Sequence, residues 1–406
     1  MSSSALARVD AAGLNGPVVL PGLIPSPRLA WAALFLNVLA FSGLPTLIPI
    51  PGSVGQLLTQ GAVLAAVLLA LLANRSVVIR PNLLLTLLTL LAVVSLMASV
   101  HNEFLAGSTY RAFRLLAFIA ALWLLTPWWG RSDFVLLRAH ITCLRVVLVT
   151  VLIGAVVAHG DAFAYGGRLS GALWPIPPTQ VAHYSAVLIG CTTVLWFAER
   201  TRGRTALVTL LAATPALLLT HTRTALLALL VGLAVAGASM FFGHARVRRT
   251  TAVVGGLAVT AGALFSPLIV GWLWRGQSLE EASQLTGRTK VWSSISALQR
   301  PRLEEIFGSG LSNKSFDGLP IDSSWLSVYV DQGWFGTVVV AALLLVIVFW
   351  AVTHRRGARR ALALFLVTYC IIASFTETGL GDASPYLLEL VLAGSLLAAP
   401  ASGENL

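Results

Sequence analysis

The chain has 406 residues, of which 57% are hydrophobic and only 11% charged, and its formal net charge is +11. A folded soluble protein needs more polar residues than this to cover its surface, so the composition excludes a soluble domain. Nucleic-acid binding is also excluded as the reason for the positive charge, because the basic residues occur in short clusters between long apolar segments.

Twelve apolar segments are each close to the roughly 20 residues with which a helix crosses the hydrocarbon layer of a bilayer. The sequence therefore predicts an all-α polytopic membrane protein with twelve transmembrane helices. The predicted spans are 29–50, 54–73, 82–100, 112–129, 134–158, 178–198, 205–220, 224–243, 250–271, 333–353, 361–380 and 385–400. The first span is expected to act as an uncleaved anchor, because the residues before it lack the layout of a signal peptide.

Arginine residues mark alternate connections between these spans. They follow the second, fourth, sixth, eighth and tenth spans: Arg75, Arg80, Arg131, Arg200, Arg202, Arg204, Arg246, Arg248, Arg249, Arg355, Arg356, Arg359 and Arg360. Basic residues concentrate in the cytoplasmic loops of membrane proteins. The pattern therefore predicts that both termini lie in the cytoplasm.

The longest polar segment, residues 272–332, connects the ninth and tenth predicted spans on the opposite side. Within it, residues 278–299 are predicted to form a helix, because Ser278 can cap its start, Glu281 follows three residues later and Pro301 ends it. The predicted organisation is a cytoplasmic segment 1–28, nine spans in 29–271, an extracytoplasmic loop with helices in 272–332, and three spans in 333–406.

Two arginines fall inside the fifth predicted span. Arg138 can reach the cytoplasmic surface, whereas Arg145 lies deeper and needs an acidic partner or a polar cavity. Glu377 and Glu389, in the last two spans, are the predicted partners, and a structural ion pair is the favoured interpretation for Arg145 and Glu389. The alternative is that residues 134–145 lie along the membrane interface and leave a shorter span.

Neither the histidines nor the cysteines have the spacing of a metal site. Three scattered histidines are interpreted as structural: His140, His183 and His221. The odd number of scattered cysteines, Cys143, Cys191 and Cys370, argues against a disulfide framework.

Five short motifs follow one another in the C-terminal 60% of the chain. They are Gly167-Arg168-Leu169-Ser170-Gly171 with Trp174-Pro175, then Thr222-Arg223-Thr224-Ala225, then Gly287-Arg288 with Trp292, then Pro301 with Gly308-Ser309-Gly310-Leu311, and last Asp322-Ser323 with Gly333 and Gly336. In this order they resemble motifs of the O-antigen ligase and Wzy-type polymerase family of bacterial membrane glycosyltransferases, which implies a GT-C-like membrane fold. The ligases have histidine where this chain has Asp322, so the resemblance favours a polymerase.

The resemblance implies an enzyme of the bacterial inner or plasma membrane that transfers or polymerises a glycan linked through diphosphate to a polyprenol. Because the diphosphate is the leaving group, neither a metal nor a cofactor is expected, and direct displacement inverts the anomeric carbon. Arg223 and Arg288 are the predicted diphosphate ligands, and Asp322 is the predicted base. The predicted substrate-binding residues are Arg168, Arg114, Trp292, Lys290 and Trp325. The expected partners are the lipid-linked donor, a glycan acceptor, the bilayer, a flippase and a chain-length regulator.

Other interpretations of the same residues stay open. The protein could be a ligase that transfers the glycan to a different acceptor, a peptidoglycan polymerase of the shape-and-elongation type, or a polytopic transporter or lipid-linked glycan flippase. Asp322 could be only a helix N-cap, and Arg288 a charge on a solvated helix face. Arg223 could be an arginine that reaches the membrane interface, and the tryptophans could be interface anchors.

Overall fold

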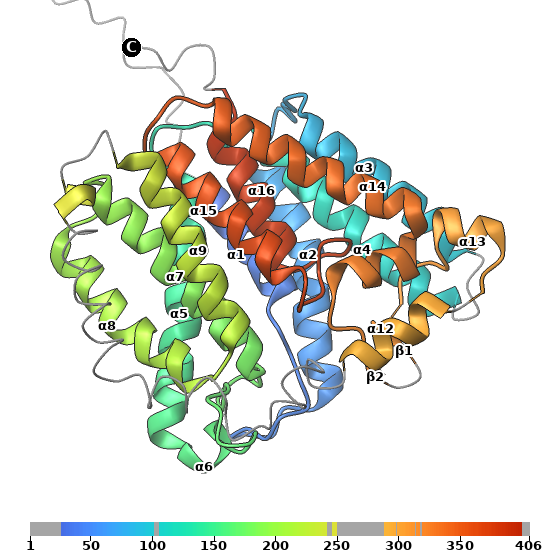
Figure 1. Ribbon diagram of the computed structural model, residues 1–406, viewed down its shortest axis with the longest axis horizontal. Helices are drawn as coiled ribbons and strands as arrows, with labels where there is room; N and C mark the ends of the chain where they lie inside the picture. The colour runs from blue at the N-terminus through green and yellow to red at the C-terminus, as the bar shows by residue number, and fades with distance from the viewer. Residues whose placement is uncertain are drawn as a thin grey trace, which may run out of the picture.

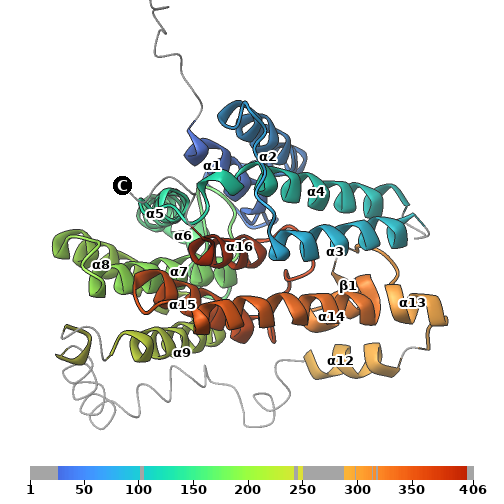
Figure 2. The ribbon, with the colours of Figure 1, turned by 90° about the horizontal axis from the view of Figure 1, so that it is seen from above.

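The computed structural model describes residues 26–100, 105–241, 246–249, 288–297, 299–312, 314–316 and 319–399, and these form a helical bundle (Figures 1 and 2). Two short strands, β1 (Ser315–Phe316) and β2 (Leu319–Pro320), pair in antiparallel orientation. Within the described residues, six helices are long and apolar enough to cross a membrane, namely α2, α4, α5, α7, α9 and α14. The prediction of an all-α, multi-pass membrane protein is therefore confirmed.

Most predicted spans overlap one helix of the bundle. In chain order the helices are α1 (Pro27–Val38), α2 (Gly52–Ala73), α3 (Leu83–Ser99), α4 (Leu105–Leu124), η1 (Thr126–Trp128), α5 (Val135–Val157), α6 (His159–Ala162), α7 (Pro178–Phe197), α8 (Gly203–Leu219), α9 (Arg223–Met240), α12 (Arg288–Ala297), α13 (Arg302–Phe307), α14 (Ser324–Thr353), α15 (Ala358–Ala373) and α16 (Pro385–Leu397). The predicted span 250–271 and residues 278–287 of the predicted loop helix lie outside the described residues. Passage of all twelve segments through a membrane stays a prediction.

The predicted first span, 29–50, is wrong in its length. Helix α1 has 12 residues and ends at Val38, which at 1.5 Å per residue gives about 18 Å of helix, too short to cross about 30 Å of hydrocarbon. Prolines in the following segment cannot continue a helix. The backbone of residues 39–51 instead bonds to the connection before α7: the Ser42 and Leu47 N–H groups donate to the carbonyl oxygens of Pro175 and Ala172, both at 2.9 Å.

Two further boundaries differ from the prediction. Helix α15 ends at Ala373, so Glu377 lies in the connection that follows and not inside the predicted span 361–380. The interfacial alternative for residues 134–145 is also wrong, because α5 is one continuous helix from Val135 to Val157.

Because successive helices run in opposite directions, the arginine-bearing connections lie at one end of the bundle, here called the arginine-rich end. The contacts between them are direct. Arg359 donates to the Gly130 carbonyl oxygen at 2.7 Å, and the Gly130 N–H donates to the Ser395 carbonyl oxygen at 2.9 Å. The Arg80 N–H donates to Thr126 Oγ1 at 3.0 Å. The other end, formed by the connections from α1 to α2, α5 to α7, α8 to α9 and α15 to α16, is called the loop end.

At the loop end, α13 packs against a break in α14. Gly333 has φ 65° and ψ −164°, so α14 consists of two helical pieces joined at this residue. A Cβ atom on Gly333 would lie 2.4 Å from the backbone of Ile306, and one on Gly308 would lie 2.2 Å from the backbone of Asp331. The glycines of two sequence motifs are thus required by the close approach of two backbones. The predicted start of the tenth span, at residue 333, coincides with this break.

We expect Gly333→Ala to destabilise the protein, while Gly237→Ala in α9 does not. The left-handed backbone at Gly333 alone costs a non-glycine residue about 1–3 kcal/mol, and the contact with Ile306 adds to this. A Cβ at Gly237 meets open space, so alanine there can only improve helix propensity. Thermal unfolding of the purified variants in detergent measures the difference; equal melting temperatures would contradict the packing described above.

Candidate functional site

The connection before α7 lies against the turn between α8 and α9. Arg168 Nε donates to the Thr220 carbonyl oxygen at 2.8 Å, and Arg168 Nη2 donates to Thr222 Oγ1 at 3.0 Å. Arg223 directly follows Thr222, is the first residue of α9 and is half-buried. Two predicted anion-binding arginines are therefore brought to one turn, and the guanidinium of Arg168 also holds that turn in place.

Residues 374–384, between α15 and α16, connect this turn to the start of α14. Thr376 Oγ1 donates to Thr224 Oγ1 at 3.0 Å, in the first turn of α9. On the other side, Ser324 Oγ donates to the Glu377 carbonyl oxygen at 2.7 Å, and Trp325 Nε1 donates to Ser374 Oγ at 3.0 Å. The start of α9, which carries Arg223, and the start of α14, which follows Asp322, thus share one loop.

Arg114 binds the same loop from a third direction. Its Nη2 donates to the Ala383 carbonyl oxygen at 3.0 Å and lies 3.7 Å from Asp382 Oδ1. The same side chain borders a cavity of about 180 Å³ between α2 and α4, together with Tyr110 and Phe113. Arg114 is therefore engaged in holding the loop and also borders a small cavity.

Asp322 is not the N-cap of α14. The cap is Ser323, with extended backbone at φ −160° and ψ 126°, and the Ser323 side chain itself makes no capping hydrogen bond. Asp322 lies one residue earlier and is half-buried, between the buried side chains of Ile321 and Ser323. The capping interpretation of this carboxylate is thus wrong in its position, although the predicted role as a base stays a prediction.

Helix α12 is attached to α14 by a small apolar cluster. Val291 and Ile295 pack with Ile321 and Val330, and Trp292 is partly buried against them. Part of the Trp292 ring therefore packs against this cluster, and only the rest of the ring could contact a ligand. The side chains of Arg288 and Lys290, at the start of the same helix, lie outside the described residues.

The sequence analysis missed a buried ion pair beside these residues. Asp331 is fully buried, its Oδ2 contacts Lys314 Nζ, and its Oδ1 accepts a hydrogen bond from the Ser312 N–H at 3.3 Å. Arg111 Nη1 donates to the Ser312 carbonyl oxygen at 2.6 Å. The pair fixes the segment before β1 onto α14. Its only signal in the sequence is an acidic residue between the Asp322-Ser323 motif and Gly333.

A second polar cluster lies in the core of the bundle, among α5, α7, α15 and α16. Glu389 of α16 is fully buried, with Oε1 at 2.9 Å from His183 Nε2 and 3.8 Å from His140 Nε2. His183 Nδ1 lies 3.2 Å from the Tyr369 hydroxyl. The predicted pairing of Glu389 with Arg145 is therefore wrong: two histidines from α5 and α7 face this carboxylate.

Comparison with known proteins adds no family to these observations. No model of a known protein family matches the chain, and no curated protein sequence matches it significantly. Among the described residues, no group of three or more histidine, cysteine, aspartate or glutamate side chains is placed to hold a metal ion. The class defined by the fold is a multi-pass helical membrane protein in which polar and charged residues of distant segments meet at one end.

Proposed function

We propose that the chain is a membrane glycosyltransferase that extends or transfers a polyprenyl-diphosphate-linked oligosaccharide, and most specifically a Wzy-like polysaccharide polymerase. The observation that carries the proposal is the junction at the loop end. There, the segments with Arg168, Arg223, Arg114 and Asp322 are all bonded to residues 374–384 or to the turn beside them. These segments include three of the five motifs that resemble the glycosyltransferase family.

The proposed reaction is a single displacement. The hydroxyl oxygen of the acceptor sugar attacks the anomeric carbon of the donor, and the bond from that carbon to the diphosphate oxygen breaks. The hydroxyl proton goes to the Asp322 carboxylate. The electron pair leaves with the polyprenyl diphosphate, and the configuration at the anomeric carbon is inverted.

In this proposal, arginine side chains stabilise the departing diphosphate. A guanidinium stays protonated and can donate two parallel hydrogen bonds to phosphate oxygens, so its interaction strengthens as negative charge develops. Arg223 is the principal candidate, because it stands at the N-terminus of α9, where the helix dipole also favours an anion. Arg288 is proposed as the second ligand, from the start of α12.

The proposal also specifies which end of the bundle faces which side of the membrane. Twelve spans with both termini in the cytoplasm place the arginine-rich end inside, in agreement with the positive-inside rule. The loop end then faces the extracytoplasmic side of a bacterial inner or plasma membrane, where lipid-linked glycans would be presented by a flippase. A chain-length regulator would be a further partner of a polymerase.

Replacement of Arg223 by lysine tests the diphosphate assignment. We expect Arg223→Lys to release polyprenyl diphosphate at least about tenfold more slowly than wild type, because an ammonium cannot form the paired hydrogen bonds. The measurement is release of polyprenyl diphosphate by purified protein in detergent that contains lipid-linked oligosaccharide. Arg204→Lys, at the arginine-rich end, is the matched control. Unchanged release by the Arg223 variant would refute the assignment.

The wild-type result in this assay also separates the competing functions. Release together with longer lipid-linked glycans supports a polymerase. Release without longer lipid-linked glycans, together with transfer of the glycan to a different acceptor when one is added, supports a ligase. Movement of the intact lipid-linked glycan across a vesicle membrane without release would support a flippase and overturn the proposed transferase.

A further inference from the structure

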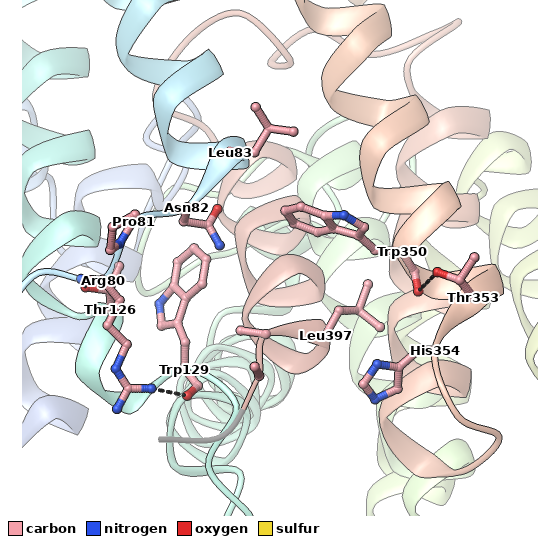
Figure 3. Close-up of a pocket in the computed structure, with 12 residues that line it drawn as sticks. Arg80, Pro81, Asn82, Leu83, Thr126, Trp129, Trp350, Thr353, His354 and Leu397 are labelled. Atoms are coloured by element: carbon pink, nitrogen blue, oxygen red, sulfur yellow. Dashed lines mark hydrogen bonds between the residues drawn. The ribbon is translucent and has the colours of Figure 1, made fainter. Parts of the chain in front are cut away.

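A cavity of about 750 Å³ opens at the arginine-rich end, at the opposite end of the helices from the candidate site. Figure 3 shows the residues that line it. It lies among the start of α3, the ends of α14 and α16, and the segment after α4. Its volume is in the range of ligand sites, which is about 300–1,000 Å³. The proposed glycosyl transfer makes no use of it.

The polar groups that border this cavity include the side-chain amide of Asn82. Asn82 uses its Oδ1 to accept from the Leu84 and Leu85 N–H groups, at 3.0 and 3.3 Å. Figure 3 shows its amide nitrogen directed towards the space between the two indoles of Trp129 and Trp350. An amide donor directed into this space favours a ligand that brings oxygen acceptors.

The electrostatic surroundings favour an anion. Arg80 and His354 border the cavity, and none of its described lining residues is acidic. The pKa of His354 is lowered, first by partial burial and then by the positive charges of Arg359, Arg360 and Arg355. The field in this region is therefore positive, and an oxyanion placed here would be stabilised by it.

The apolar surroundings favour an anion that carries hydrocarbon. Leu83 borders the cavity at the start of α3 and is 51% exposed, and Leu397 of α16 also borders it. Trp129 and Trp350 place two indoles at its border, and indoles are typical of the level of the lipid headgroups. A free phosphate ion would satisfy the donors but would leave this apolar surface unused.

We propose that the cavity binds the phosphate headgroup of an anionic phospholipid, with the acyl chains along the apolar surface that begins at Leu83 of α3. Arg80 and the Asn82 amide group bind the phosphate oxygens. The lipid ties the start of α3 to the end of α14, and so stabilises the arginine-rich end. This inference does not depend on glycosyl transfer.

Lipid binding by the purified protein tests the proposal. Delipidated protein in detergent is titrated with phosphatidylglycerol, and binding is followed by native mass spectrometry and by the rise in melting temperature. We expect Arg80→Gln to weaken binding roughly tenfold, the usual effect of losing a hydrogen bond from a charged group. Arg75→Gln, an exposed arginine of the same connection, is the matched control and should bind like wild type.

Four outcomes would overturn the proposal. Equal binding of phosphatidylcholine would remove the requirement for an anionic lipid, and an equal effect of inorganic phosphate would assign the cavity to free phosphate. An equal loss in Arg75→Gln would indicate a diffuse basic surface. Asn82→Asp keeps the side-chain oxygen that caps α3 and replaces the amide donor with a carboxylate, so unchanged affinity in this variant would contradict the cavity as the binding site even where Arg80→Gln does not fold.

Discussion

Glu389→Ala is expected to lower the free energy of unfolding by about 3–5 kcal/mol, because it removes the carboxylate that two buried histidines face. His140 packs edge-on against Trp31 and Phe35, and among the described residues neither of its ring nitrogens has a hydrogen-bond partner. His183 retains only the Tyr369 hydroxyl at 3.2 Å. The change leaves buried polar groups in a membrane-embedded core, where their cost is high.

The measurement is thermal unfolding of purified variants in one detergent. Glu389→Gln preserves the shape and part of the hydrogen-bonding capacity, so we expect a smaller loss than for alanine. Ser395→Ala on the same helix removes only a local hydrogen bond to the Leu392 carbonyl oxygen and serves as the control. If Glu389→Ala and Ser395→Ala unfold at the same temperature, the buried cluster does not stabilise the bundle.

Asp322→Asn is expected to lower the rate of glycan transfer by about 10²–10⁴-fold, the usual contribution of a positioned base. The amide has nearly the same shape as the carboxylate but cannot accept the proton of a sugar hydroxyl. The N-cap of α14 is Ser323, so the helix start should be unchanged. Glu304→Gln, an exposed carboxylate of α13, is the control and should retain wild-type activity. Full activity of the Asp322 variant would remove the base from the proposed mechanism.

Properties that depend on local sequence could be predicted for this chain. The predicted spans 134–158 and 178–198 correspond to α5 and α7 because length and hydropathy determine a membrane helix. The failure of the first span was avoidable, since Pro45, Pro49 and Pro51 all follow the observed end of α1 and signal that a helix cannot continue.

Properties that depend on distant partners could not be predicted. Glu389 meets His140 and His183 only because α5, α7 and α16 pack together, and hydropathy does not encode that choice of neighbours. Arg168 bonds to residues more than 50 positions later in the chain. The motifs identified candidate residues in the sequence. That the segments carrying these residues meet beside residues 374–384 follows from the packing of the helices.

The size distribution of the lipid-linked glycan made by purified wild-type protein, compared with that made by Asp322→Asn, tests the central claim most directly. The protein in detergent is given one polyprenyl-diphosphate oligosaccharide as both donor and acceptor. The account predicts a ladder of longer glycans with equimolar polyprenyl diphosphate for wild type, and almost none for the variant. A ladder of the same length and rate from both proteins would contradict the assignment of Asp322, and the absence of any lengthening by wild type would contradict the polymerase.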